Sequence, residues 1–194
     1  MKPMTFALIL LTTVLLCCKT GKQKDPAEKN AKPANYFPVA DYLRSEIHYV
    51  DSLPLGITKY TVNNAKTDTF YIQAAEFDRI TKDFISNDLE PEVFEKAFSE
   101  TSFIDASTRS ATFTYSPKNS DQTEVTRVDV LTSAGEGTNK VSSIYLEMLL
   151  HKNDTTIIKK LLWRTRTSLQ IVSSKEVKGQ QPVVDQLKLV WGIE

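Results

Sequence analysis

The sequence predicts an α+β fold in which N-terminal helices and a β-hairpin pack on a mainly antiparallel meander sheet of about seven strands. Apolar residues recur at helical spacing in the first half of the chain, whereas they alternate with polar residues after Phe103. Short polar turns separate the alternating runs, which favours antiparallel neighbours because a parallel pair needs a long crossover. We therefore expect the helices to cover one face of a single sheet.

Three helices are expected before Phe103. The first begins near Pro38 and ends before Pro54, since proline suits a helix start and stops a helix from continuing. Its apolar face comprises Val39, Leu43, Ile47 and Val50. The second helix presents Phe77, Ile80, Phe84 and Ile85. The third begins at Pro91 and presents Val93, Phe94, Ala97 and Phe98.

The strands follow from alternation. A hairpin after the first helix is predicted from two short runs, 57–62 and 69–72, on either side of a polar loop. The longest apparent strand begins near Ile157 and continues to Ile171. Its odd positions are apolar and are expected to be buried: Leu161, Trp163, Leu169 and Ile171.

The beginning of the chain has the pattern of a secretory signal. Lys2 precedes an uncharged run from Thr5 to Leu16. This run is shorter than the roughly 20 apolar residues that a spanning helix needs, but it fits the apolar core of a signal peptide. Residues 1–17 are therefore interpreted as a signal peptide that is removed.

The end of this signal, Leu15-Leu16-Cys17-Cys18, resembles the lipobox of bacterial lipoproteins. That motif has a Leu-like residue three positions before the modified cysteine and a small residue directly before it. The other register would place the bulky Leu16 at the cleavage point, so Cys18 is the predicted lipid attachment. The resemblance implies acyl chains such as palmitate at the new N-terminus and an address at the cell envelope. Lys19 favours the outer membrane over the inner one.

A tether is expected between the lipid and the domain. Residues 19–35 contain no aromatic residue and no Val, Ile, Leu or Met, so this stretch has nothing to bury and should be disordered. Residues 18–35 would act as a lysine-rich coil with a span of about 20–25 Å. The lysines could attract anionic lipid headgroups, although a plain solvated spacer is the simpler interpretation.

Residues 36–194 are expected to form one domain with a net charge of −4. An acidic domain of this kind argues against general nucleic-acid binding, which needs a basic face. Both cysteines lie at the signal boundary, the two histidines are far apart, and no serine-nucleophile or phosphate-loop motif occurs. No catalytic residue, metal ligand or cofactor is therefore predicted. The acidic segment 83–105 is interpreted as a solvated face rather than as a metal site.

A basic group stands out on the longest predicted strand. Alternation places Lys160, Arg164 and Arg166 on one face, where they could receive a phosphate, a carboxylate or an acidic partner. They could equally pair with helices of the same domain or cover a solvent-facing sheet. The leading hypothesis is a membrane-anchored envelope lipoprotein whose domain binds a partner without catalysis. One alternative is an amphiphile carrier with an apolar cavity between the helices and the sheet, and another is a carboxylate-dependent hydrolase.

Overall fold

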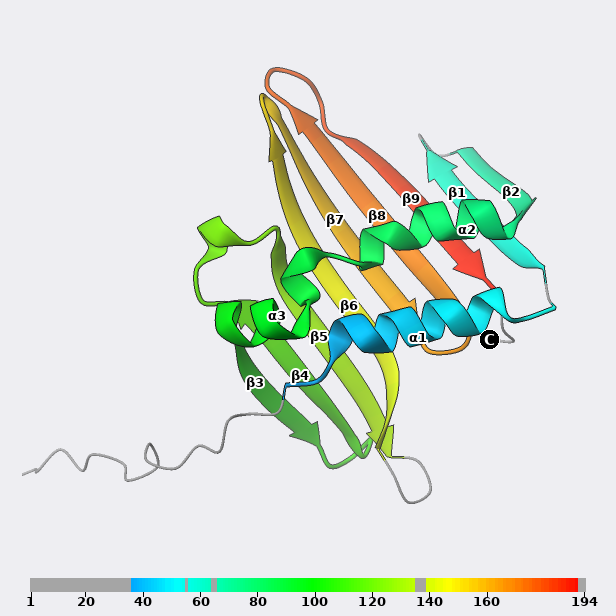
Figure 1. The fold of residues 1–194 in the computed structure, drawn as a ribbon. Helices are drawn as coiled ribbons and strands as arrows, with labels where there is room; N and C mark the ends of the chain where they lie inside the picture. The colour runs from blue at the N-terminus through cyan, green and yellow to red at the C-terminus, as the bar shows by residue number, and fades with distance from the viewer. Residues whose placement is uncertain (1–35, 55, 64–65, 135–138, 192–194) are drawn as a thin grey trace, which may run out of the picture. The chain divides into compact units, whose positions relative to one another are not determined.

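A computed structural model describes residues 36–54, 56–63, 66–134 and 139–191. Within these residues, three α-helices lie against one face of a nine-stranded antiparallel sheet, which confirms the α+β class (Figure 1). The predicted signal peptide, the lipid attachment at Cys18 and the tether lie outside the described residues. No helix in the described part of the chain is long and apolar enough to cross a membrane.

The helices begin and end near the expected residues. Helix α1 is Val39–Asp51, α2 is Ala74–Thr81 and α3 is Pro91–Ala97. The second helix is shorter than its apolar spacing indicated, because the chain tightens into a 3-10 turn at Lys82–Phe84. Phe98 is buried as the first residue of a strand rather than on the third helix.

The strands follow one another around the sheet. Their bounds are β1 Ile57–Asn63, β2 Lys66–Ile72, β3 Phe98–Asp105, β4 Ser110–Pro117, β5 Val125–Ala134, β6 Asn139–Lys152, β7 Thr155–Arg164, β8 Ser168–Val177 and β9 Val183–Val190. The spatial order is β2-β1-β9-β8-β7-β6-β5-β4-β3, so β2 and β3 form the two edges.

The N-terminal hairpin corrects the expected sheet. It does not pack on a sheet of about seven strands, because β1 pairs with β9 in the same sheet and places Lys59 opposite Leu189. This pairing joins segments more than 120 residues apart. Hydrophobic alternation within a strand sets which side chains face the core, but it does not identify a distant neighbour.

The long strand expected from Ile157 to Ile171 is also corrected. The chain reverses between Arg164 and Ser168, so this segment forms two neighbouring strands, β7 and β8. Trp163 faces Leu169 across the hairpin, and both lie at odd positions. The period-two pattern therefore continues through the turn without a break. The turn also lacks the Gly, Pro, Asn or Asp that usually indicates one.

Aromatic side chains fill the space between the helices and the sheet. Trp163 contacts Phe84 at 5.4 Å and Trp191 at 5.2 Å between ring centroids, and Trp191 contacts Phe77 at 5.9 Å. All four rings are buried. Such T-shaped and tilted contacts add to the stability that apolar burial provides. The helix-covered face of the sheet is therefore a packed core.

Candidate functional site

Among the described residues, no helix lies on the face of the sheet opposite α1, α2 and α3 (Figure 1), and we call this face the outer face. Its residues form rows, because neighbouring strands are in antiparallel register. One such row crosses eight strands from β1 to β3 and consists of Tyr60, Lys188, Gln170, Leu162, Tyr145, Asp129, Thr114 and Thr101. The row combines apolar, charged and hydroxyl side chains. Its half on β3–β6 ends in two threonines, whereas its half on β7, β8, β9 and β1 contains Leu162 and no threonine.

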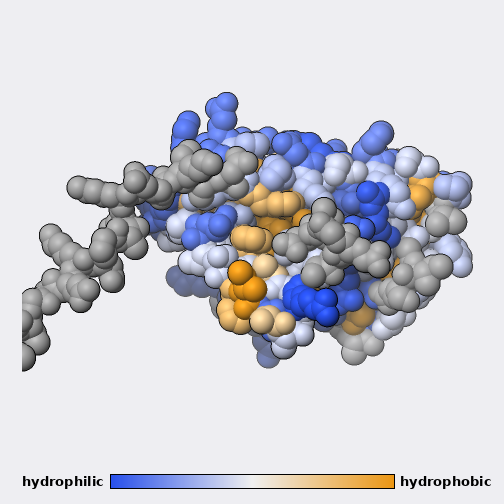
Figure 2. All heavy atoms as spheres, turned by 90° about the horizontal axis from the view of Figure 1, so that it is seen from below, coloured by the Kyte–Doolittle hydropathy of each residue, from blue (hydrophilic) through white to orange (hydrophobic). Residues whose placement is uncertain are grey.

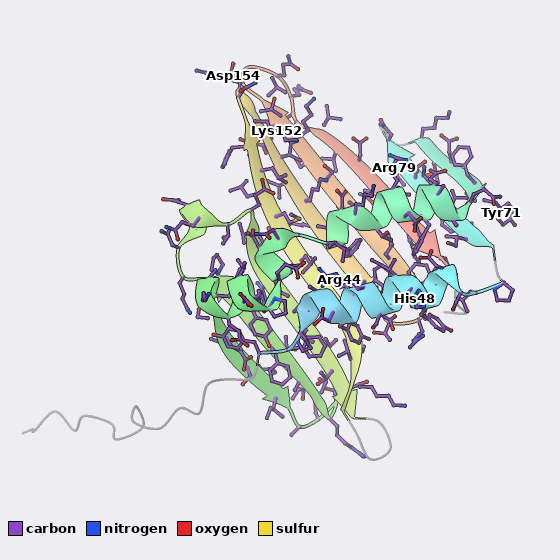
Figure 3. The ribbon with its side chains drawn as sticks, viewed as in Figure 1. Arg44, His48, Tyr71, Arg79, Lys152 and Asp154 are labelled. Atoms are coloured by element: carbon purple, nitrogen blue, oxygen red, sulfur yellow. The ribbon has the colours of Figure 1, made fainter. Side chains whose placement is uncertain are left out.

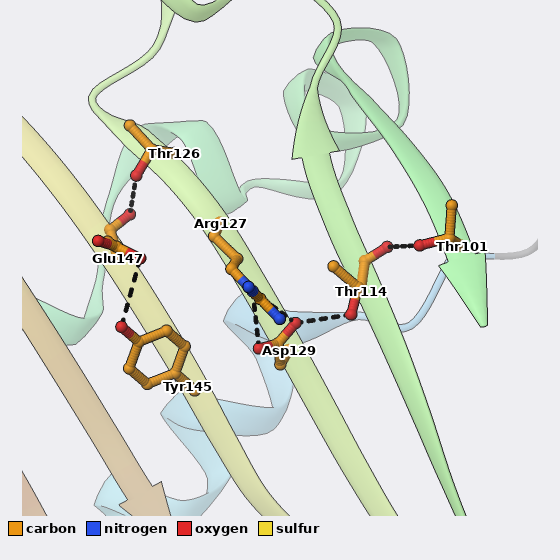
Figure 4. A network of polar contacts seen from close by, with 7 residues as sticks. All are labelled: Thr101, Thr114, Thr126, Arg127, Asp129, Tyr145 and Glu147. Atoms are coloured by element: carbon orange, nitrogen blue, oxygen red, sulfur yellow. Dashed lines mark hydrogen bonds and ion pairs between the residues drawn. The ribbon is translucent and has the colours of Figure 1, made fainter. Parts of the chain in front are cut away.

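The half formed by β3–β6 carries a polar network (Figure 4). Asp129 accepts hydrogen bonds from Arg127 Nε at 2.9 and 3.1 Å and from Thr114 Oγ1 at 2.7 Å. The Tyr145 hydroxyl lies 3.4 Å from Glu147 Oε2, to which it donates. These contacts hold the side chains in place on the sheet.

The network raises the pKa of two of its members, Arg127 and Tyr145. The hydrogen bond to Asp129 raises the pKa of Arg127, so the guanidinium stays charged. Burial, followed by the nearby charge of Glu147, raises the pKa of Tyr145, so its phenol stays neutral and donates a hydrogen bond. The arrangement suits polar recognition, because Asp129 is neutralised by Arg127 and Tyr145 holds its proton.

Two of the three predicted cations lie on the outer face. Lys160 and Arg164 are exposed on β7, on either side of the half-buried Leu162. Among the described residues, neither side chain has a hydrogen-bond or ion-pair partner. Lys160 lies opposite Glu147 on β6 and Val172 on β8, which places it at the border between the polar network and apolar side chains.

Arg166 is not on this face, which corrects the expected row of three cations. It lies in the β7–β8 turn with a positive φ of 65°. Its Nε is 3.1 Å from Glu46 Oε1, and its guanidinium carbon is 3.6 Å from the centroid of the Tyr49 ring. Arg166 therefore pairs with a helix of its own domain, one of the alternatives that the sequence left open.

Glu46 was not singled out from the sequence, yet it is 1% exposed. Its Oε2 accepts hydrogen bonds from Trp163 Nε1 at 3.3 Å and from the Arg166 backbone N–H at 3.0 Å. One turn earlier on α1, the Tyr42 hydroxyl lies 2.7 Å from Thr165 Oγ1. Burial is the main cause that raises the pKa of Tyr42. The available signal was spacing, since positions 42, 46 and 49 share one side of a helix.

The acidic segment has structural partners. Asp83 forms an ion pair with Lys159 at 2.8 Å, and Glu90 pairs with Arg44 on α1. Asp88 Oδ2 accepts the backbone N–H groups of Glu124 at 2.8 Å and Val125 at 3.0 Å, which fixes the start of β5. Three carboxylates of the acidic segment, which a metal site or a hydrolase could have used, therefore hold the domain together instead.

No group of His, Cys, Asp and Glu that could hold a metal ion occurs among the described residues. His48 lies on α1 (Figure 3), whereas His151 lies near the end of β6, with Nδ1 3.3 Å from Thr156 Oγ1. A surface hollow of about 530 Å³ includes His151 with Asp88, Asp121 and Glu124, but its other lining is mostly hydroxyl and amide groups. None of the residues that line this hollow belongs to the aromatic cluster of Trp163, Trp191, Phe77 and Phe84.

No family model, curated protein or solved structure matches the chain. The function is therefore inferred from the geometry and chemistry of the described surfaces.

Proposed function

We propose that the chain is a lipid-anchored protein of the bacterial cell envelope whose domain binds a partner through the outer face and catalyses no reaction. The observation that carries the proposal is the uncovered outer face, where exposed Lys160 and Arg164 flank apolar side chains. An antiparallel sheet with one solvated face normally presents mainly polar residues there.

The outer face departs from that pattern. Large apolar side chains recur on it and are half-buried or exposed: Tyr60, Val62, Tyr145, Leu149, Ile158, Leu162, Val172 and Val190. Contiguous apolar surface with a polar rim is typical of a binding surface. The neighbouring polar network supplies fixed hydrogen-bonding groups that could give specificity.

The cations indicate the chemistry of the partner. An arginine guanidinium can bind a carboxylate through two hydrogen bonds, and a nearby lysine adds a second positive charge. We propose an envelope protein that presents carboxylates around an apolar patch. The outer membrane remains the proposed address, through the lipid on Cys18.

The packing of the core supports a binding module more than an amphiphile carrier. Trp163, Trp191, Phe77 and Phe84 occupy the space where a carrier would need its cavity. A groove of about 300 Å³ beside β8 and β9, lined in part by Ile171 and Leu187, keeps the carrier as a second candidate. That volume is at the lower end for small-molecule sites.

The lipid anchor is tested by replacing Cys18 with Ser and growing cells with labelled palmitate. We expect the Cys18→Ser variant to lose the label, because serine cannot form the thioether. Cys17→Ser is the matched control and should keep the label, since serine is a small residue suited to the position before the modified cysteine. Label retained in Cys18→Ser would contradict the anchor.

The binding surface is tested by photocrosslinking in intact cells. A photoreactive amino acid at position 162 should form an adduct of defined mass, because Leu162 lies between Lys160 and Arg164. The same group at Arg79, exposed on α2 (Figure 3), should not form that adduct. Reversing both charges, Lys160→Glu with Arg164→Glu, should remove the adduct without unfolding the domain. An adduct that survives this reversal would contradict the proposed surface.

A further inference from the structure

The β3–β4 hairpin at one edge of the sheet exposes two large apolar side chains. Phe103 is 67% exposed and Ile104 is 74% exposed, and as consecutive strand residues they point to opposite faces. Both lie close to the loop, where Asp105 pairs with Ser110. Neither side chain contributes to the core, so folding does not explain their presence.

The loop that follows these residues is held in a defined shape. Asp105 Oδ1 accepts hydrogen bonds from the Ser107 N–H at 2.8 Å, the Ser107 hydroxyl at 2.6 Å and the Thr108 N–H at 3.4 Å. The hydrogen bonds from Ser107 are the main cause that lowers the pKa of Asp105 to about 2. The carboxylate is therefore charged at neutral pH and keeps the turn formed.

The same end of the sheet carries cations. Arg109 is exposed in the loop with a positive φ of 51°. Lys140 is exposed on β6, and the register aligns it with Ser133 and Ser110 in the row that ends at Asp105. Neither Arg109 nor Lys140 has a side-chain partner among the described residues. Asp105, the carboxylate of the same loop, accepts hydrogen bonds from Ser107 and Thr108 and, in the described part of the chain, has no ion pair with either cation. In a domain with a net charge of −4, two cations against this one carboxylate, beside apolar side chains, indicate an anionic surface as the partner.

The view of the domain from below is consistent with this arrangement. Figure 2 shows apolar residues gathered on that side, next to strongly hydrophilic ones. Aromatic and aliphatic side chains with adjacent Lys or Arg are typical of surfaces that lie in a membrane interface.

The chain also enters the domain at this edge. The Tyr36 hydroxyl donates to the Phe98 carbonyl oxygen at 3.0 Å, and the Phe37 N–H donates to the Tyr115 hydroxyl at 3.2 Å. From Phe98, β3 extends for about 23 Å to the hairpin loop. The expected tether spans a similar distance, about 20–25 Å. A lipid on Cys18 and the hairpin can therefore reach the same membrane surface.

We propose that the β3–β4 hairpin inserts Phe103 and Ile104 into the interface of an anionic bilayer, with Arg109 and Lys140 against the lipid headgroups. This inference rests on the proposed lipid anchor and adds an orientation to it. A second copy of the chain paired along β3 fits less well. Edge pairing joins backbone groups in the plane of the sheet, so it would not cover both faces on which Phe103 and Ile104 project.

The test uses the mature lipidated chain in vesicles of phosphatidylethanolamine and phosphatidylglycerol in a three-to-one ratio. An environment-sensitive fluorophore is attached to Ala106→Cys, in the hairpin loop, or to Asp154→Cys, in the β6–β7 turn at the other end of the sheet (Figure 3). Lipid blocks Cys18, and the described domain has no other cysteine. Lipids with brominated acyl chains should quench the hairpin fluorophore about twofold or more, and the control fluorophore little, because an interfacial group reaches the acyl boundary.

A second variant distinguishes insertion of Phe103 and Ile104 into the bilayer from a hairpin that only lies near the membrane. Phe103→Ser with Ile104→Ser should abolish the quenching, while the chain still floats with the vesicles and keeps its unfolding midpoint. An unquenched Ala106→Cys fluorophore on a chain that floats overturns the inference and leaves the anchor intact. A chain that does not float overturns the anchor and the inference with it. Self-quenching that rises with protein density in unbrominated vesicles assigns the hairpin to a second copy and overturns the membrane contact.

Discussion

Trp163→Ala is expected to lower the free energy of unfolding by about 3–5 kcal/mol, the range for removing a large aromatic side chain from a core. Trp163 is fully buried and contacts the rings of Phe84 and Trp191. Its removal would leave a cavity between the helices and the sheet, and it would also remove the indole donor to Glu46. Urea denaturation followed by far-UV circular dichroism measures the loss.

Two variants make this result specific. Trp163→Phe keeps an aromatic ring against Phe84 and should lower the free energy of unfolding by about half as much. This variant loses only part of the side-chain volume, together with the indole N–H that donates to Glu46. Tyr71→Ala removes a side chain that is 84% exposed at the other edge of the sheet and should change stability by about 0.5 kcal/mol or less. Equal losses for Trp163→Ala and Tyr71→Ala would contradict the packed core.

The features that sequence reasoning predicted are local ones. The apolar spacing of Val39, Leu43 and Val50 predicted α1, and all three are buried. Alternation likewise indicated that Leu161 and Leu169 face the core, and both are buried. Such patterns suffice because burial repeats with the period of the secondary structure.

The corrections concern features that local patterns do not encode. The β7–β8 turn escaped detection because Trp163 and Leu169 keep the same parity across it. The β1–β9 pairing depends on a neighbour more than 120 residues away. The β1–β9 pairing adds the N-terminal hairpin to the sheet and so leaves β2 as one open edge.

Part of the candidate site was predictable because alternation within one strand sets the face on which each side chain lies. Alternation places Lys160 and Arg164 on one face, and the structure has them there. Arg166 does not lie on that face, because it belongs to the β7–β8 turn. Its partner Glu46 lies 120 residues earlier in the chain. A glutamate on an amphipathic helix gives no local sign that it will be buried. The free-energy cost of burying its carboxylate is offset only by hydrogen-bond donors that the fold brings to it.

Glu46→Ala should cost about 3 kcal/mol of unfolding free energy. Removing one member of a buried ion pair typically costs 3–5 kcal/mol because the other charge is left without a partner. The lower end applies here, since the Arg166 side chain is 52% exposed and water can solvate its guanidinium. The Trp163 indole N–H and the Arg166 backbone N–H would be left without their acceptor, and the first of these is buried.

The contributions of Glu46 can be separated by a graded series. Glu46→Gln retains one acceptor oxygen but removes the charge, so about 1.5 kcal/mol should be lost. Arg166→Ala leaves the buried Glu46 carboxylate without its cation and removes the contact with Tyr49, so about 3 kcal/mol should be lost. In a double-mutant cycle, Arg166→Ala should cost less when Glu46 is already Ala, because the ion pair is then absent. If the two losses were simply additive, the ion pair between the Glu46 and Arg166 side chains would contribute nothing, and the carboxylate would be held by the Trp163 indole N–H and the Arg166 backbone N–H alone.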